Sequence, residues 1–254
     1  MKAALLVLAI TAATPAGTPT AYQLYAEGKY DDSVRISLAQ NDAAGYAEAA
    51  RSTLAEEAGR DSPCLPCLQR AEDYARRAIA TDPHLVDGNI YLAITLGLEE
   101  HIIGPDAARR QNFPDVARHA IDAALAVDPK NAWALAALGG WNLAIVHGGG
   151  AFLADLFYGA TVGKGLQAFE AAFEAAPNNI AVRYQYALSL SMFNEARYQP
   201  QIEAALARVV SLPTATAYER MIQKRAGDLL ELLKAGDNGA YLAVVKKYEG
   251  YPAP

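Results

Sequence analysis

The stretch that decides the fold is residues 113–129, FPDVARHAIDAALAVDP. Two further stretches align with it on their last proline: residues 67–83, CLQRAEDYARRAIATDP, and residues 165–177, GLQAFEAAFEAAP. The three prolines, Pro83, Pro129 and Pro177, are 46 and 48 residues apart, and a weaker match at Pro213 follows 36 residues later. A period of this length indicates repeated supersecondary units rather than one irregular fold.

Small residues recur at fixed distances from each proline. The position five residues before it is alanine in all three copies: Ala78, Ala124 and Ala172. A small residue at helical spacing lets two helices approach closely, and a proline cannot continue a helix but suits the first turn of the next one. Each copy therefore predicts a pair of helices that meet at the proline.

We predict an all-α fold, an α-solenoid of about ten to twelve helices stacked as antiparallel pairs. No stretch shows the period-2 alternation of a strand. The repeat predicts a single domain over residues 20–250. Insertions are expected at residues 99–113 and 145–164, the second carrying a short apolar helix over 152–158 that either fills a gap between repeats or covers a groove. A long helix that closes with residues 229–233 is expected to end at Gly236. Residues 241–248 are expected to form a last short helix, and residues 251–254 a frayed end.

The repeated residues resemble the tetratricopeptide repeat (TPR): Ala, a second Ala seven residues on, then Pro five residues further. Residues 27–34, EGKYDDSV, look like a TPR turn followed by the start of a second helix. The resemblance covers roughly residues 20–235, although the period here exceeds the usual TPR length of 34 residues.

A narrower resemblance rests on residues 128–141, DPKNAWALAALGGW, and 157–160, FYGA. These look like the TPR-like domain of the regulator of microtubule dynamics family and its bacterial relatives. The periplasmic TPR component associated with TRAP transporters is similar in plan. These resemblances imply a scaffold or a carrier of hydrophobic ligands, without catalysis.

The N-terminus predicts export. Lys2 supplies a positive charge, residues 3–13 are apolar over the length of a signal-peptide core, and small residues follow. We expect a signal peptide over residues 1–16 and a periplasmic or secreted product; a cytosolic alanine-rich tail is the alternative. No other apolar run reaches the length of a membrane span, so an integral membrane protein is not expected.

Charge and motif content exclude several classes of function. The net charge is −6, with 22 basic and 28 acidic residues and no basic block, which argues against nucleic acid as a partner. Residues 159–165, GATVGKG, lack the spacing and the Ser or Thr of a phosphate-binding loop. The four histidines are scattered without a zinc or triad pattern. We therefore predict no enzyme activity, no cofactor and no metal.

The two cysteines, Cys64 and Cys67, form a Cys-x-x-Cys motif just before a helix that is predicted to start near Leu68. A helix N-terminus lowers the pKa of a thiol, but no βαβ pattern of a thioredoxin-like fold accompanies the motif. A structural disulfide that holds the helix start is the leading interpretation, provided that the protein is exported. A redox pair, or free thiols that bind a metal, remain alternatives.

The concave face of a TPR array is the expected binding surface. The repeat phase places mainly apolar residues there, with Arg220 and Lys224 at one end. Such a surface meets a partner helix, a lipid chain or the protein's own insert, or it closes and becomes core. The candidate groove residues are Ile90, Ile94, Leu98, Trp133, Ala136, Gly140, Leu143, Tyr184, Leu188 and Met192.

These features predict an exported adaptor that binds a protein partner through the groove. The alternative is a carrier for a hydrophobic small molecule or acyl chain, with Trp133, Tyr184 and Met192 among its contacts.

Overall fold

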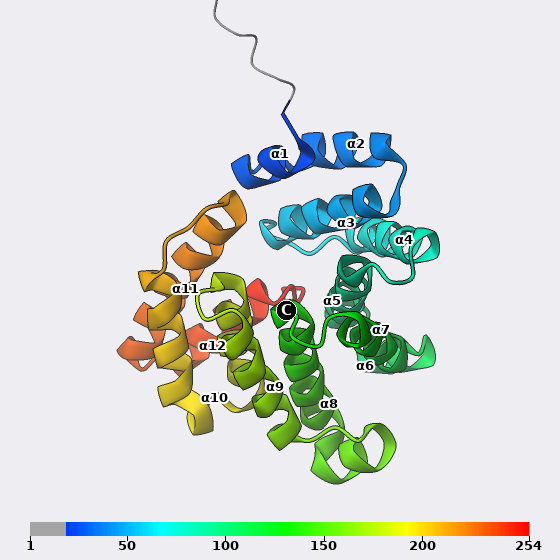
Figure 1. The fold of residues 1–254 in the computed structure, drawn as a ribbon. Helices are drawn as coiled ribbons and strands as arrows, with labels where there is room; N and C mark the ends of the chain where they lie inside the picture. Colours follow the sequence, from blue (N-terminus) through cyan, green and yellow to red (C-terminus); the bar gives the residue numbers. More distant parts are fainter. Residues whose placement is uncertain (1–18, 254) are drawn as a thin grey trace, which may run out of the picture.

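The computed structural model describes residues 19–253, which form twelve α-helices and no strand (Figure 1). The predicted signal peptide, residues 1–16, lies outside the described residues. The helices are α1 (Ala21–Glu27), α2 (Tyr30–Gln40), α3 (Ala43–Ala58), α4 (Leu65–Thr81), α5 (Val86–Ile103), α6 (Pro105–Arg110), α7 (Phe113–Val127), α8 (Ala132–Tyr158), α9 (Val162–Ala175), α10 (Ile180–Ser211), α11 (Ala217–Ala235) and α12 (Asn238–Tyr248).

The three repeated prolines lie in links of the same length and geometry. Residues 82–85, 128–131 and 176–179 join α4 to α5, α7 to α8 and α9 to α10. In each link the backbone N–H of the last residue donates to the carbonyl of the first, as from Asn131 to Asp128 at 3.1 Å. Asn131 and Asn179 then cap α8 and α10 with their side chains. The expected pairs of helices that meet at a proline are therefore present.

The small positions of the repeat lie where helices touch. Ala78, Ala124 and Ala172 are fully buried. One close approach joins α8 to α9, where a Cβ on Gly139 would lie 2.5 Å from Cδ2 of the buried ring of Phe169. Small side chains thus set the distances between neighbouring helices, as the spacing predicted.

Two helices contain a break. At Gly150 (φ 75°) α8 changes direction, and the segment beyond it forms the predicted short apolar helix. Its Phe152 and Phe157 are exposed, whereas Ala154 packs with Val146 near the far end of α8. In α10 the break falls at Asn194, whose side chain caps the following turn by accepting from the N–H of Arg197. The first expected insertion, residues 99–113, is instead the last turn of α5 followed by the short α6.

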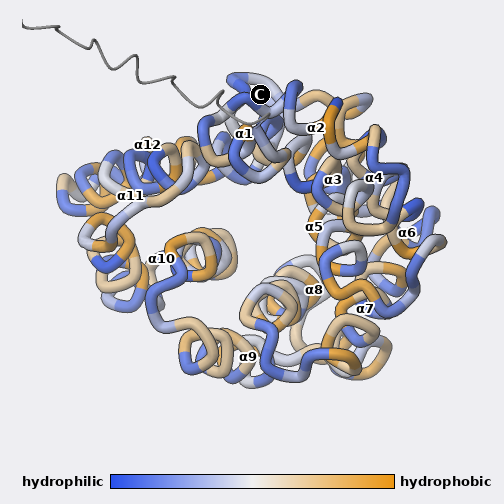
Figure 2. Tube along the Cα trace, turned by 45° about the horizontal axis from the view of Figure 1, so that its top comes forward, coloured by the Kyte–Doolittle hydropathy of each residue, from blue (hydrophilic) through white to orange (hydrophobic). Residues whose placement is uncertain are grey.

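The chain curves until its C-terminal helices return to the first ones (Figures 1 and 2). On α11, Arg220 donates to the carbonyl of Ala26 in the last turn of α1, and Arg225 donates to the carbonyl of Ala58 at the end of α3. Lys247 on α12 forms an ion pair with Asp61 at 3.0 Å. These contacts join parts of the chain that are far apart in the sequence.

The C-terminal end packs against α5, so the expectation that Tyr251 lies in a frayed end was wrong. The Tyr251 ring stacks on His101 with ring centroids 4.1 Å apart. The ring N–H of His101 at Nδ1 donates to the carbonyl of Glu249 at 2.6 Å. Burial lowers the pKa of His101, which keeps its ring neutral. The aromatic stack and this hydrogen bond together hold the chain in place through Tyr251.

Among the described residues, no single helix has both the length and the apolar character to cross a membrane. Only α8 and α9 taken together have the required length and apolar character, and these two helices are bent by 86° relative to one another.

Candidate functional site: an aromatic pocket

Most of the candidate groove residues are packed inside the protein. Leu143, Tyr184 and Leu188 are buried in the largest hydrophobic cluster, with Met192 packed against it, and Ile90 is buried beside α7 and α8. Ile94 and Leu98 pack against Leu54 and Leu68 of α3 and α4. Of the eight apolar candidates other than Ala136 and Gly140, Trp133 alone lines the aromatic pocket described below, and this residue is 38% exposed. Burial of the others corresponds to the alternative in which the concave face closes and becomes core.

The pocket beside Trp133 has a volume of about 220 Å³. Aromatic side chains from four helices dominate its wall: Tyr22 and Tyr25 of α1, Tyr91 of α5, Trp133 of α8 and Tyr218 of α11. Its remaining lining residues are Arg51, Asn179, Ala181, Thr216 and Glu219. The return of α11 to α1 therefore leaves a small aromatic pocket on the inner side of the arc.

Two matching tetrapeptides place tyrosines from both ends of the chain in this pocket. Residues 20–23 read TAYQ and residues 216–219 read TAYE. Each begins a helix with the same capping box, in which the threonine hydroxyl accepts from the N–H three residues on and the Gln or Glu side chain accepts from the threonine N–H. The tyrosine then falls in the first turn of α1 and of α11, where it lines the pocket.

Hydroxyl groups hold α1 in place behind its tyrosines. Ser33 of α2 donates to the carbonyl of Ala21 at 2.8 Å, and Ser52 of α3 donates to Ser33 at 2.9 Å. All three residues are buried. This chain of hydrogen bonds fixes one wall of the pocket relative to α3.

Arg51 lies flat against the tyrosines with its charge paired. Its guanidinium carbon is 4.2 Å from the ring centroid of Tyr25 and 5.1 Å from that of Tyr22. The same group forms an ion pair with Glu48 one turn earlier on α3. A stacked, paired arginine adds a polar edge to the aromatic wall without an uncompensated positive charge.

Three of the pocket tyrosines, Tyr25, Tyr91 and Tyr218, are kept neutral. Burial raises the pKa of Tyr218 to about 12, and it raises the pKa of Tyr25 and of Tyr91 further, although Arg51 lowers the pKa of both. Glu219 is engaged with two backbone N–H groups at the start of α11. These rings therefore offer hydroxyl donors and flat apolar faces, which suit binding.

The repeat phase identified Trp133 but missed Tyr22, Tyr25, Arg51 and Tyr218. Tyr22, Tyr25 and Arg51 lie before the first clear repeat, and Tyr218 lies in its weakest copy. The matching TAYQ and TAYE segments were the available signal, because two helices that begin identically place equivalent side chains at equivalent positions. Two basic residues were predicted at one end of the groove. Arg220 donates a hydrogen bond to α1, and Lys224 forms an ion pair with Asp228 on the surface.

The insertion at residues 145–164 contributes no residue to the pocket lining, and its alternative role as a lid over the groove stays a prediction. Trp133 lies at the start of α8 and Gly150 lies 17 residues further on, which corresponds to about 25 Å along a helix. The insertion packs at the opposite end of α8, where its Ala154 and Ala160 lie with Trp141 and Phe193.

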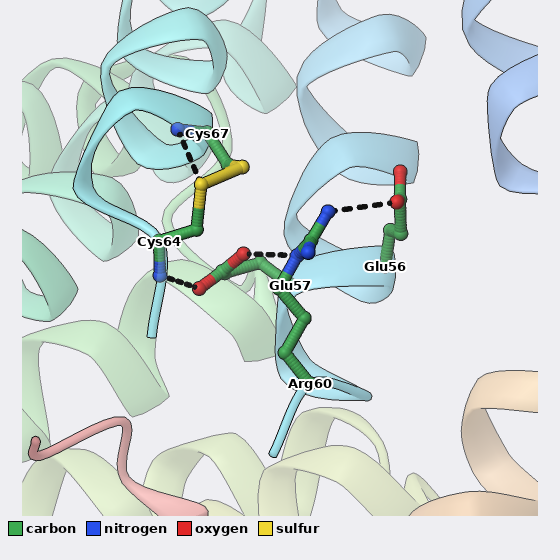
Figure 3. Close-up of a disulfide and its surroundings, with 5 residues drawn as sticks. All are labelled: Glu56, Glu57, Arg60, Cys64 and Cys67. Carbon is green, nitrogen blue, oxygen red and sulfur yellow. Dashed lines mark hydrogen bonds and ion pairs between the residues drawn. A yellow bond between two sulfur atoms is a disulfide. The ribbon is translucent and has the colours of Figure 1, made fainter. Parts of the chain in front are cut away.

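The cysteines lie at the start of α4, with Cys64 just before the helix and Cys67 in its first turn. Their sulfur atoms are 2.07 Å apart, at disulfide distance, and Cys64 caps α4, which begins at Leu65 rather than near Leu68 (Figure 3). With Glu57 they make up the one group of potential metal ligands found among residues 19–253. While the two sulfurs are bonded to each other, neither is a thiolate that could bind a metal.

The fold and the pocket define an all-helical protein whose paired helices surround an aromatic pocket of side-chain size. The family model for regulator of microtubule dynamics protein 1-3 matches residues 18–234. The chain therefore belongs to the regulator of microtubule dynamics family, and the match covers all the helices except α12 and the last residue of α11. No curated protein matches the chain.

Proposed function

We propose that this protein is an exported TPR-type adaptor that binds a segment of a partner protein in the aromatic pocket, and that this pocket has no catalytic activity. The observation that carries the proposal is the composition of that pocket: four tyrosines and a partly exposed tryptophan around a paired arginine. Tyr, Trp and Arg are the residues most enriched among those that dominate the binding energy of protein interfaces.

The size of the pocket favours a side chain over a lipid. Pockets that enclose drug-sized ligands have volumes of roughly 300–1,000 Å³, whereas this one has about 220 Å³. An aromatic or branched aliphatic side chain fits such a volume, and the hydroxyl groups and Arg51 at its wall suit the flanking peptide groups. A carrier of a hydrophobic small molecule is the second candidate, supported by the family resemblance to scaffolds and carriers.

The repeated helix pairs and the two cysteines support the remaining parts of the proposal. Equal proline links and buried alanines at equivalent positions are typical of TPR-type pairs, and TPR arrays, including the periplasmic component of TRAP transporters, act by binding. A disulfide is compatible with the oxidising compartment that a signal peptide would reach. Cell fractionation tests export. Mature protein that keeps Met1 would contradict it.

Quantitative co-purification tests the adaptor function. Trp133→Ala and Tyr22→Ala remove two aromatic walls of the pocket, so we expect recovery of the partner to fall about tenfold or more, as for residues that dominate an interface. Phe152→Ser is the matched control, because that ring is exposed on the insertion far from the pocket. Equal recovery with all three variants would refute binding through the pocket.

Native mass spectrometry of the purified full chain separates the two candidate functions. A carrier retains an apolar small molecule, which Trp133→Ala would release; an adaptor gives the mass of the protein alone. Detection of such a molecule, released by Trp133→Ala but not by Phe152→Ser, would replace the adaptor with the carrier.

A further inference from the structure

A second arrangement of reactive groups lies at the start of α4, and the pocket does not use it. Cys64 is the cap residue of this 17-residue helix, and the backbone N–H of Cys67 points at its Sγ at 3.3 Å. Cys64 is half-buried, whereas Cys67 is buried behind it. Cys64 is therefore the more accessible of the two cysteines.

A buried carboxyl group accompanies the two sulfurs (Figure 3). Glu57 of α3 is 8% exposed, and one of its oxygens lies within 4.8 Å of both sulfur atoms. Its Oε1 accepts from the N–H of Cys64 at 2.5 Å, and its Oε2 lies 2.9 Å from Nε of Arg60 in an ion pair without hydrogen-bond geometry. Burial raises the pKa of this carboxyl, while the Cys64 N–H and Arg60 act to lower it.

A purely structural bond explains this arrangement poorly. A disulfide between residues three apart closes a very short loop, and such a bond restricts the unfolded chain least. Nor does a structural disulfide need a carboxyl group beside it, and burying one is unfavourable. An accessible sulfur, a buried sulfur and a buried acid are, in contrast, the groups that thiol–disulfide exchange requires.

We propose that Cys64–Cys67 is a redox-active disulfide that oxidises a dithiol substrate, with Glu57 as the group that gives a proton to Cys67 and takes one from the substrate. A substrate thiolate, having released its proton to solvent, attacks Sγ of Cys64. The bond between the cysteines breaks, its electron pair goes to Sγ of Cys67, and that sulfur takes the proton of the Glu57 carboxyl.

The second substrate thiol completes the exchange. It gives its proton to the Glu57 carboxylate and attacks the substrate sulfur of the mixed disulfide, so that Cys64 leaves as a thiolate. The substrate has lost two electrons and become a disulfide, and the two cysteines have gained them. The start of α4 and the N–H of Cys67 stabilise the Cys64 thiolate, which makes it the better leaving group.

Single-cysteine variants test the assignment of the two sulfurs. Reacted with glutathione disulfide, Cys67→Ser leaves the accessible, stabilised Cys64, and Cys64→Ser leaves the buried Cys67. We expect the first variant to form its mixed disulfide at least about tenfold faster. Equal rates, or faster reaction of Cys67, would overturn the proposal, as would a wild-type disulfide that dithiothreitol reduces only when the protein unfolds.

Glu57→Gln tests the proton transfer, with Glu56→Gln on the neighbouring residue as its control. Glutamine can still accept from the Cys64 N–H, so the local backbone is retained. We expect reduction by dithiothreitol to slow about tenfold in Glu57→Gln and its pH profile to lose one ionisation, with Glu56→Gln like the wild type. Identical rates and profiles in the two variants would refute the role of Glu57, and circular dichroism verifies that both are folded.

Discussion

At the scale of single residues, the contact between α8 and α9 depends on the absence of one methyl group. Phe169 is fully buried against Gly139, and a Cβ there would lie within 3 Å of three ring atoms. Gly97 of α5 is a helical glycine of the opposite kind, exposed and with nothing within 4 Å of an added Cβ. The two glycines therefore separate the effect of helix propensity from that of packing.

We predict opposite effects of the same substitution at these positions. Gly139→Ala forces Phe169 or α9 to move and should lower the free energy of unfolding by about 1–3 kcal/mol. Gly97→Ala should raise it by about 0.5–1 kcal/mol, because alanine is the better helix former. Urea unfolding measures both, and a Gly139→Ala protein as stable as Gly97→Ala would contradict the close contact.

The second residue-scale feature is Glu99, a buried carboxyl in α5. Burial, and then its neighbour Glu72, raise its pKa to about 7, while Arg76 acts in the opposite direction. Its Oε1 is buried and has no hydrogen-bond partner among the residues described. The folded protein thus holds a proton that the unfolded chain, with an ordinary value of 4.5, releases earlier as the pH rises.

The sign of the resulting pH dependence follows from proton binding. Between pH 4.5 and about 7 the folded state binds more protons at Glu99 than the unfolded state, so this group lowers stability as the pH rises. Glu99→Gln removes that effect. Relative to the wild type, its melting temperature should increase from about pH 5 to about pH 8; a difference that is the same at both pH values would exclude a raised pKa.

At the scale of elements, α12 completes the core although the family match ends before it. Tyr241 and Val245 are fully buried against α10 and α11, and the Tyr241 hydroxyl is 2.6 Å from that of Ser191. The residues after α12 reach α5 through Glu249 and Tyr251. This helix is therefore part of the structure that brings the two ends of the chain together.

Removal of residues 237–254 should destabilise the protein by more than about 3 kcal/mol, since it deletes two fully buried side chains and uncovers their partners. Removal of residues 252–254 is the control, because Pro252 and Ala253 are exposed and Tyr251 is kept. Denaturant unfolding of both truncated proteins measures the difference. Equal stability would show that α12 is dispensable.

The elements that the sequence predicts best are those with local causes. The proline links, the end of α11 at Gly236 and the short helix near residues 241–248 each follow from residues within one or two turns. The break of α10 at Asn194 has no comparable local pattern. The closing contacts could not be predicted, because they join residues as distant as Ala26 and Arg220, which are 194 positions apart, and no repeat relates them.

At the scale of the whole molecule, closure of the arc creates the pocket. Tyr22 and Tyr218 come from opposite ends of the chain, and only the return of α11 to α1 brings them together with Trp133. Leu143, Tyr184 and Leu188 are buried instead by neighbouring helices, in one cluster with side chains of α9, α11 and α12. A prediction from repeat phase alone assumes an open array, which is why it found one pocket residue and several core residues.

Site-specific photo-crosslinking in cells tests the pocket as the binding site most directly. A photoreactive amino acid replaces Trp133 in one protein and Arg70, an exposed α4 residue outside the pocket, in another. We predict a discrete adduct with one partner protein from position 133, lost when Tyr22→Ala is added, and no such adduct from position 70. The same adducts from both positions, or none from position 133, would contradict partner binding in the aromatic pocket.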